Sequence, residues 1–585
     1  MRYFASVLVL TMPALPAFGA VGISPAYQQL VPRQSINFLA SGAPVIWQVD
    51  NVVGGNATFG TITQAGVFTA PSTLPTPAAV TVTAVSATDP NDVATATITV
   101  LAQAATGITR YVATGGRDTN PGTLAAPFAT LQHAADLASP GDTVLVRGGI
   151  YSQLLTPTRS GNASAGPITI ASYPGETATL DGTGLAIPNG QNGLVTLNNI
   201  SSVIVQGFEL RNYTTASLAQ VPVGMYVTGA GDGVQLVGNH VHNITTTAVT
   251  NANQCGSNAL GVAVYGNLSP AAITRLVISG NEIDHLKTGC SESMSINGNV
   301  SNFVVMNNRV HDNNNIGIDA IGFEGVSPKP ATDQARGGEI RGNLVYNITS
   351  YGNPDYGNQY ASDGIYVDGG TNIVIEQNIV HDTDFGIELA SEHYGRTTSN
   401  VIARNNVIHD DNASGITIGG YGAARGGTAQ CMIVGNTLFR NDTKNTGSGE
   451  IQIQYHAAGN TIENNIVSAG SQGLLLNSYT ASATVPASLD HNLYFVPSGS
   501  QVQYVWKAKH YASLSSYQAA ASQDPHSTFA DPHFISTTTP NLDLQADSIA
   551  VNAGILMPAT VIGNADILGK PRVTNGAVSE GAYQK

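Results

Sequence analysis

The sequence QNIVHDTDFGIELASEH, residues 377–393, contains the two patterns that determine the predicted fold. The first is an Asn followed by apolar residues and a His, as in Asn378 to His381. The second is a Gly followed by alternating apolar and polar residues, as in Gly386 to Ala390. Both patterns recur, and successive copies of the Asn are 27 to 42 residues apart. Such periodicity is typical of a solenoid in which each repeat forms one coil.

The first pattern predicts an internal ladder of amide side chains. Its Asn recurs as Asn239, Asn281, Asn308, Asn343, Asn378, Asn406, Asn436 and Asn465. An amide repeated at one position can satisfy backbone groups of the next coil, so we interpret this column as structural. His242, His311, His381 and His409 share another repeat position with Tyr346 and Phe439, which indicates stacked packing residues rather than a catalytic set.

The N-terminus predicts export. Residues 1–20 hold Arg2, an apolar run and small residues at the end, which is the layout of a secretory signal peptide. The apolar run is too short to span a bilayer, and no other run reaches that length, so no membrane span is expected. We therefore expect a secreted protein, extracellular, periplasmic or at the cell surface.

Composition favours an extended β protein and excludes some partners. The 585 residues include 64 Gly and only 10% charged residues, with a net charge of −15. Low charge and abundant Gly are typical of turn-rich β structure. A negative field repels nucleic acid, so no nucleic-acid partner is expected. An acidic polysaccharide would need a local basic patch or a bound cation.

Residues 21–103 predict a separate β-sandwich. Short alternating runs such as VIWQV and VTVTA are separated by turn residues, and Trp47 is expected to be buried. The segments VGISPAYQQL, GTITQAGVFTAPSTLP and ATATITV resemble bacterial immunoglobulin-like domains. The resemblance implies a spacer or surface-display module.

The segment that follows predicts the cap of the solenoid. Residues 128–138 have helical periodicity, and a strand is expected from Thr143 to Arg147. Together with PITIASYPGETATLDGTG, this segment resembles the opening of right-handed parallel β-helix proteins, including pectate lyases of polysaccharide lyase family 9. The resemblance implies an all-β chain with a right-handed parallel β-helix over 108–480 and a short capping helix. Residues 481–585 resemble the C-terminal closure of such proteins.

The cysteines predict one disulfide bond. Of the three, Cys255 and Cys290 fall on neighbouring repeats, so we expect them to pair in an exported protein, with Cys431 free and buried.

The second pattern predicts a column of functional side chains. Alternation sends Ile365 and Val367 inward and Tyr366 and Asp368 outward. The first outward column is Tyr226, Ala263, Ser295, Asp319, Tyr366, Glu388 and Thr417. The second is Thr228, Tyr265, Asn297, Ile321, Asp368, Ala390 and Gly419.

Acidic residues crowd into three of these coils although charge is scarce elsewhere, and two long segments, 322–336 and 347–362, border them. Clustered charge beside long loops predicts a functional site. The predicted catalytic residues are Asp319, Asp368, Glu388, Arg336 and Lys287. The predicted substrate-binding residues are Tyr366, Glu392, His393, Arg396, Tyr360 and Lys329. A Ca²⁺ ion is expected at Asp319, Glu324, Asp363 and Asp368.

Three functions remain open. A lyase acting on a uronate-containing polysaccharide needs a base and a cation that neutralises the substrate carboxylate. An inverting glycoside hydrolase needs only an acid and a base on opposite sides of the bond. A non-catalytic surface adhesin or glycan-binding solenoid needs neither. The calcium-binding Asp pair followed by Lys that the lyase family shows does not occur here, nor does the Gly-His-Gly of polygalacturonases. A polysaccharide lyase that works as a monomer is the leading hypothesis.

Overall fold

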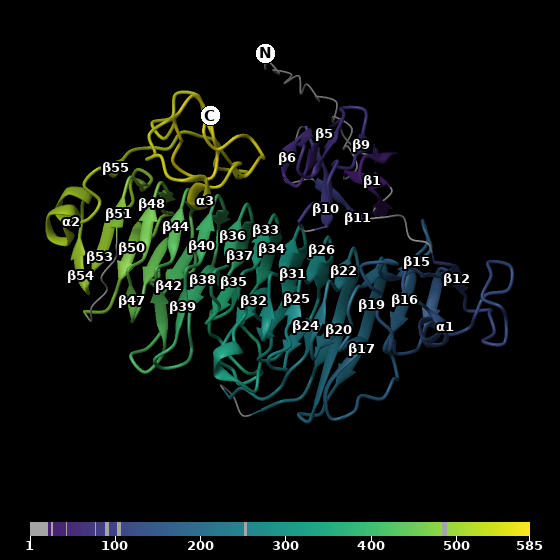
Figure 1. Cartoon of the computed structure of the whole chain (residues 1–585). Coiled ribbons are helices and arrows are strands. Elements are labelled where there is room, and N and C mark those ends of the chain that lie inside the picture. The colour runs from purple at the N-terminus through teal and green to yellow at the C-terminus, as the bar shows by residue number, and fades with distance from the viewer. Residues whose placement is uncertain are drawn as a thin grey trace, which may run out of the picture.

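Three parallel β-sheets wind into a right-handed β-helix in the computed structural model of the chain (Figure 1). The structure describes residues 21–24, 27–41, 44–76, 78–87, 93–101, 107–250, 254–481 and 488–585. The predicted signal peptide, residues 1–20, lies outside them. Within the described residues, no helix is long and apolar enough to cross a membrane.

The strands of each sheet come from successive coils. Sheet 1 contains β12 (Thr109–Val112), β13 (Thr143–Val146), β15 (Ile168–Ser172), β18 (Val203–Gln206), β22 (Gln235–Val237), β26 (Val277–Ser279), β30 (Val304–Met306), β33 (Glu339–Arg341), β36 (Val374–Glu376), β40 (Ile402–Arg404), β44 (Met432–Val434), β48 (Thr461–Glu463) and β51 (Ser488–Asp490). Sheet 2 contains β14 (Gly149–Tyr151), β16 (Ala178–Asp181), β19 (Phe208–Thr215), β23 (His240–Thr246), β27 (Glu282–Asp284), β31 (Arg309–Asn313), β34 (Leu344–Ile348), β37 (Ile379–Thr383), β41 (Val407–His409), β45 (Thr437–Phe439), β49 (Ile466–Ser468), β52 (Leu493–Phe495) and β55 (Thr528–Phe529).

Sheet 3 contains β17 (Gly190–Asn198), β20 (Gln220–Thr228), β24 (Leu260–Gly266), β28 (Met294–Gly298), β32 (Ile318–Ile321), β35 (Asp363–Asp368), β38 (Phe385–Ala390), β42 (Ile416–Ile418), β46 (Ile451–Ile453), β50 (Leu474–Ser478), β53 (Gln503–Trp506) and the antiparallel β54 (Lys509–Tyr511). Short strands extend the corners: β21 (Gly231–Asp232), β25 (Ile273–Thr274), β29 (Val300–Ser301), β39 (Thr397–Ser399), β43 (Gly427–Ala429) and β47 (Ala457–Ala458).

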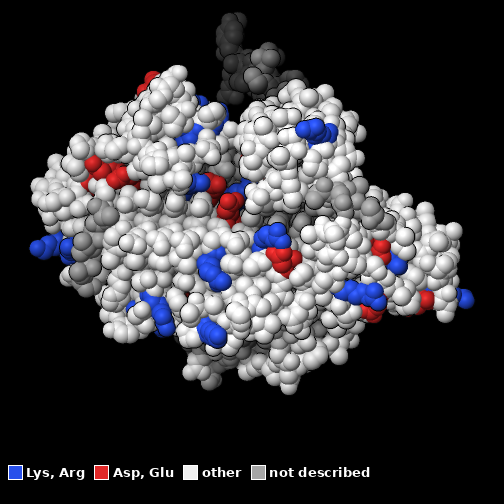
Figure 2. Space-filling view, in the orientation of Figure 1, with Lys and Arg blue, Asp and Glu red and all other residues white. Residues whose placement is uncertain are grey.

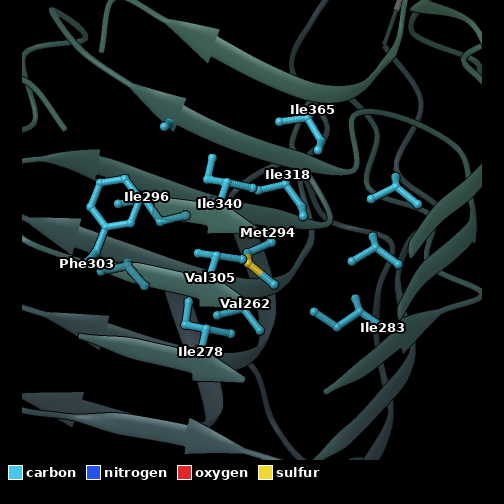
Figure 3. Packing of buried hydrophobic residues seen from close by; sticks show 14 of the residues in the cluster. Val262, Ile278, Ile283, Met294, Ile296, Phe303, Val305, Ile318, Ile340 and Ile365 are labelled. Atoms are coloured by element: carbon cyan, nitrogen blue, oxygen red, sulfur yellow. The ribbon is translucent and has the colours of Figure 1, made fainter. Parts of the chain in front are cut away.

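One apolar core fills the solenoid. Figure 3 shows side chains from the three sheets meeting inside it, among them Ile278 from sheet 1, Ile283 from sheet 2 and Ile318 from sheet 3. All three are fully buried. The inward set of each strand comes from alternate positions, because side chains alternate across a strand.

The predicted Asn ladder is confirmed. Asn378 donates from its backbone N to Asn406 Oδ1 at 3.0 Å and from its Nδ2 to Ile340 O at 2.9 Å and to Asn406 Oδ1 at 2.9 Å. The same pattern runs from Asn239 to Asn465 and continues to Asn492, one coil further than the sequence pattern indicated. The predicted stacking is also present, since the ring of Tyr346 lies 4.6 Å from that of His311 and 5.1 Å from that of His381.

Both ends of the solenoid are covered (Figure 1). The predicted helix is α1 (Leu131–Leu137), capped by Thr130 Oγ1, which accepts from the His133 backbone N at 3.3 Å. At the other end, α2 (Leu514–Ala521) packs Tyr517 against Tyr504. The parallel strands continue past residue 480 through β51, β52 and β53, so the solenoid is longer than predicted.

The C-terminal segment covers more than the last coil, contrary to the sequence interpretation. After β56 (Phe534–Ser536) and β57 (Asn541–Leu544), it runs back beside the solenoid, where α3 (Ala559–Ile562) contacts β40 and β44. Asn405 Nδ2 donates to Ile562 O at 2.8 Å, and Ala582 N donates to Thr437 Oγ1 at 2.9 Å. This segment therefore buries the side of several coils.

The N-terminal module is a β-sandwich with a buried Trp47, as predicted. One sheet contains β2 (Tyr27–Leu30), β11 (Val93–Val100), β10 (Ala79–Ser86), β5 (Val45–Val49) and β6 (Val52–Val53). The other contains β3 (Ser35–Asn37), β9 (Val67–Thr69), β8 (Gly60–Ile62) and β7 (Gly55–Asn56), and a short pair joins β1 (Gly22–Ser24) to β4 (Leu39–Ser41). Its immunoglobulin-like character stays a prediction.

This module is packed on the solenoid. Ala79 packs with Val277, Val304 and Met306, and the buried Arg341 of β33 forms an ion pair with Asp50 at 3.3 Å. Gln48 Nε2 also donates to Leu568 O in the C-terminal segment at 3.2 Å. These contacts fix the module beside the C-terminal segment, as Figure 1 shows.

Charge is sparse on the face shown in Figure 2, where most of the surface carries neither Lys, Arg, Asp nor Glu. The disulfide bond between Cys255 and Cys290 is present with a Cα–Cα distance of 5.5 Å, and Cys431 is free and buried, both as predicted.

We predict that Asn378→Ala lowers the free energy of unfolding by about 3 kcal/mol, because it leaves buried backbone groups of two coils without partners. Urea unfolding measures the change. The matched control is the exposed Asn358, whose replacement by Ala should change stability by less than about 0.5 kcal/mol. Equal effects of the two substitutions would contradict a structural role for the ladder.

Candidate functional site

Strand register confirms the first predicted column. In sheet 3, Ser295 pairs with Asp319, Asp319 with Tyr366, Tyr366 with Glu388 and Glu388 with Thr417. The alternate positions, such as Ile365 and Val367, are fully buried in the core. Asp319 and Glu388 therefore lie on the outer face of the sheet, two coils apart, with Tyr366 between them.

The second column is continuous only in part. Asp368 pairs with Ala390 as predicted, but Ile321 bridges Gly369 in antiparallel fashion instead of aligning with Asp368. The chain bends at this point, where Gly322 N donates to Asp368 O at 2.7 Å. The predicted pairing of Ile321 with Asp368 is absent because the parallel register of β32 and β35 covers only Ile318 with Ile365 and Asp319 with Tyr366.

The outward carboxylates are buried. Asp319 is 3% exposed, Asp368 5% and Glu388 9%, although all three lie at outward positions of sheet 3 strands. Segments 322–338, 349–362 and 391–396 connect the strands that carry these residues. Burial on an outer face requires cover, so these loops shield the carboxylates from water.

Seven acidic residues form what we call the acidic cluster: Glu292, Asp319, Glu324, Asp363, Asp368, Glu388 and Glu392. Burial raises the pKa of Asp319 well above its ordinary value, and the charges of Glu292 and Asp368 add to the effect. Burial likewise raises the pKa of Asp368, assisted by the charge of Glu392, whose backbone N donates to Asp368 Oδ1 at 2.8 Å. The cluster therefore resists full ionisation.

Two carboxyl groups in the cluster interact directly. Asp363, at the start of β35, is hydrogen-bonded to Glu388. Burial raises the pKa of Glu388 to about 7, while the hydrogen bond with Asp363 opposes the rise. Burial and the charge of Glu388 raise the pKa of Asp363 well above its ordinary value. A carboxyl group that titrates near neutrality can act as a general acid or base.

Basic residues contribute little to the cluster. Among the described residues, no Lys or Arg forms an ion pair with any of its seven members, and the ion pair to Glu324 comes from His393, whose Nε2 lies 2.8 Å from Glu324 Oε1. Arg425 is the nearby cation, and its charge lowers the pKa of Glu392, which burial raises. Within the part of the chain that the structure describes, the negative charge of the cluster is therefore not balanced by ion pairs with Lys or Arg.

The structure does not bring the predicted bases to the carboxylates. Lys287 lines a separate pocket of about 990 Å³ together with Tyr351 and Asn353. Arg336 donates to Gln334 O at 2.9 Å and to Asn299 Oδ1 at 2.7 Å. Both lie in or beside loops of variable length, whose course the repeat pattern does not determine.

Only some of the predicted substrate-binding residues lie in the acidic cluster. Tyr366 is within the cluster, where burial and then the charges of Asp368 and Glu388 raise its pKa. Arg396 lies over the ring of Phe323 at 4.9 Å, next in sequence to Glu324. Tyr360 stacks on Tyr351 at 4.8 Å, and Lys329 is exposed before the short helix η1 (Pro330–Thr332).

Glu292 was not among the residues predicted for the site, and Tyr356 was expected near it only as part of the long segment 347–362. Burial raises the pKa of Glu292 to about 7, and the charges of Glu324 and Glu392 contribute. Tyr356 accepts a hydrogen bond from Asn315 Nδ2 at 3.4 Å and lies within the field of Glu292. Glu292 stands directly before the aligned segment SMSING, so extending that alignment by one residue would have found it.

The cluster has the ligand chemistry of a cation site. Buried Asp319 Oδ1 and Asp363 Oδ1 have no hydrogen-bond partner. Glu324, Asp368 and His393 each place a ligand atom within 4.8 Å of the others. Carboxylate oxygens are the ligands that Ca²⁺ prefers, so Glu324 and Asp368 have the chemistry to hold such an ion, and Asp319 and Asp363 add two unpartnered oxygens to the same cluster. Binding of Ca²⁺ stays a prediction.

Comparison with known proteins agrees with the fold. A family model described as "Pel9A-like, right handed beta helix region" matches residues 110–273, and one described as "Right handed beta helix region" matches residues 331–511. YwoF of Bacillus subtilis (strain 168) is 37% identical over 441 residues, which are 75% of this chain and 91% of YwoF. The chain therefore belongs to the pectate-lyase-like right-handed β-helix family, together with YwoF.

A shorter match and two solved structures are also similar. Pectate lyase PEL9 of Emericella nidulans is 32% identical over 171 residues, which are 27% of this chain and 40% of PEL9. The structure of pectate lyase Pel9A has a TM-score of 0.43 and 17% identity, with coverage of 82% of this chain and 97% of Pel9A. The structure of XylC with xylose has a TM-score of 0.47 and 12% identity, with coverage of 82% and 98%.

We predict that Glu388→Gln flattens the pH dependence of stability. The pKa of Glu388 rises from 4.5 to about 7 on folding, so its contribution is greatest below about pH 4.5 and is lost as the pH rises through 7. Without Ca²⁺, the melting temperature of the wild type should fall between about pH 5 and pH 8, and that of the variant should fall less. Parallel curves for the two proteins would contradict the assigned burial of the charge.

Proposed function

We propose that the protein is an exported polysaccharide lyase that cleaves a uronate-containing glycan at the acidic cluster. The family contains enzymes that act on polysaccharides, and pectate lyase PEL9 is among the relatives. The signal-like residues 1–20 support action outside the cell. The observation that carries the proposal is the pair of buried, unpartnered oxygens, Asp319 Oδ1 and Asp363 Oδ1, within uncompensated acidity.

A divalent cation would reconcile this acidity with an acidic substrate. Asp319, Asp363, Asp368 and Glu324 are the residues that would hold Ca²⁺. When bound, the ion supplies positive charge that neutralises the substrate carboxylate and so acidifies the adjacent C–H. Its charge would also offset the repulsion that adds to the effect of burial on the pKa of Asp319, Asp363 and Asp368.

Elimination also requires a group that takes a proton. The base removes the proton beside the uronate carboxyl group, a carbon–carbon double bond forms, and the glycosidic oxygen leaves with the bonding electrons. Burial raises the pKa of both Glu388 and Glu292 to about 7, and Glu388 is the one whose hydrogen bond with Asp363 holds its carboxyl group in place. We therefore assign the base to Glu388 in place of Lys287 and Arg336, which have other neighbours.

Hydrolysis is the second candidate, and the Asp363–Glu388 pair favours it. A carboxyl group protonated near neutrality is the acid that an inverting glycosidase uses, and Asp319 two coils away could activate water from the opposite side. This reaction needs no cation.

The experiment is a screen of the purified chain on pectate, alginate, glycosaminoglycans and neutral plant glycans, each with Ca²⁺ and with chelator. We expect an ultraviolet-absorbing unsaturated product from an acidic glycan that disappears with chelator. Reducing ends without that absorbance would establish hydrolysis. Cleavage of none of these glycans would contradict both reactions and favour a binding role.

We predict that Asp319→Asn and Glu388→Gln each lower the cleavage rate by roughly 100-fold or more, since each removes a charge or a proton-transfer group from the reacting site. The control is Asp382→Asn, an exposed residue outside the acidic cluster, which should retain wild-type activity. An active Asp319→Asn protein would remove the cluster as the site of cleavage.

A further inference from the structure

A second group of titratable side chains lies on the outer face of sheet 2. It comprises His240 and His242 on β23, Glu282 and Asp284 on β27, and His311 on β31, three neighbouring strands. The register pairs His240 with Glu282, and His242 with Asp284 and then His311. These residues belong to a different sheet from the acidic cluster.

The ring nitrogens in this group converge on carboxylate oxygens. His311 Nε2 lies 3.2 Å from Glu282 Oε1 and 3.8 Å from Asp284 Oδ2. His240 Nε2 lies 2.7 Å from the same Asp284 Oδ2. The ligand atoms of Glu282, Asp284 and His311 all lie within 4.8 Å of one another, as do those of His240, His242 and Asp284. Asp284 is therefore common to two overlapping sets.

The other nitrogen of His311 is already engaged. Its Nδ1 lies 2.7 Å from Asp312 Oδ2, which fixes the ring with Nε2 toward Glu282 and Asp284. A carboxylate on one ring nitrogen that orients the other toward a metal is the usual arrangement around metal-binding His residues.

His381 occupies the same repeat position as His311 and can be compared with it. His381 stacks in the same column and has the same contact between Nδ1 and the next Asp, at 2.7 Å. Within the described part of the chain, its Nε2 has no carboxylate in ion-pair range. The His-Asp dipeptide is thus a general feature of the coil, whereas the facing carboxylates are particular to His311.

We propose that Glu282, Asp284 and His311 bind a divalent transition-metal ion of the Zn²⁺ type, with His240 as the fourth ligand. Two imidazoles and two carboxylates suit Zn²⁺ and not an all-oxygen site for Ca²⁺. Arg309 Nε, 3.9 Å from Glu282 Oε1, offsets part of the surrounding negative charge. The alternative is an ion-pair network in which protonated His residues take the place of the metal.

A bound ion would join three successive coils. Its ligands come from β23, β27 and β31, so binding should stabilise the folded state over the unfolded chain. The ion would act independently of the reaction at the acidic cluster.

The test is calorimetric titration of chelator-treated, full-length protein with Zn²⁺. We expect one tight site, a higher melting temperature with Zn²⁺, and an affinity that falls by about 10- to 100-fold in His311→Gln. His381→Gln is the matched control and should bind as the wild type does. Because Glu324, Asp368 and His393 offer another site, the titration is repeated in Asp368→Asn, which should keep the tight site.

A second variant protects the test against misfolding of His311→Gln. The half-exposed His240 can be replaced by Gln with little effect on packing, and its Zn²⁺ affinity should also fall by roughly tenfold. Substitution of Co²⁺ should give a visible absorption spectrum that His240→Gln alters. Absence of tight Zn²⁺ binding, or equal binding by the wild type, His240→Gln and His311→Gln, would overturn the proposal in favour of the ion-pair network.

Discussion

The hydrogen bond from each ladder Asn to the next is the interaction on which the rest of the structure depends. Each amide binds the backbone of one neighbouring coil and the side chain of the other, at 2.9 to 3.1 Å throughout the middle of the solenoid. Because these groups are buried, a coil displaced by one residue would leave them without partners. The ladder therefore fixes the register of the coils from Asn239 to Asn492.

A fixed register brings residues at the same position of successive repeats together in space, and this alignment forms the site. Once coils stack in one register, a residue two positions after the Gly of each sheet 3 strand must lie above its counterpart in the next coil. Asp319, Tyr366 and Glu388 are brought together in this way. The loops that cover them then raise the pKa of the carboxyl groups by burial, which destabilises the fold near neutral pH unless a cation or substrate binds.

The parts of the site that follow the repeat could be predicted from the sequence, and the parts carried by loops could not. The Asn ladder, the outward column and the disulfide bond each follow from position within a coil. Lys287 and Arg336 belong to irregular segments whose length varies from coil to coil, so position within a repeat does not determine where they lie. The structure does not support the prediction that they are close to the carboxylates. The contacts of the C-terminal segment with Asn405 and Thr437 join residues far apart in sequence and have no periodic signature.

The contacts of the N-terminal module with the solenoid could not be predicted from the sequence either. Alternation predicted its sandwich and the burial of Trp47, but the ion pair of Asp50 with Arg341 depends on how two separate units meet. Nothing in either local pattern encodes that contact.

The most direct test of the central claim is a crystal structure of Glu388→Gln with Ca²⁺ and an acidic oligosaccharide. The account predicts electron density for the sugar along the outer face of sheet 3, with a uronate carboxylate and the ion beside Asp319 and Asp368. An oligosaccharide bound elsewhere, with the acidic cluster empty of both sugar and ion, would contradict it.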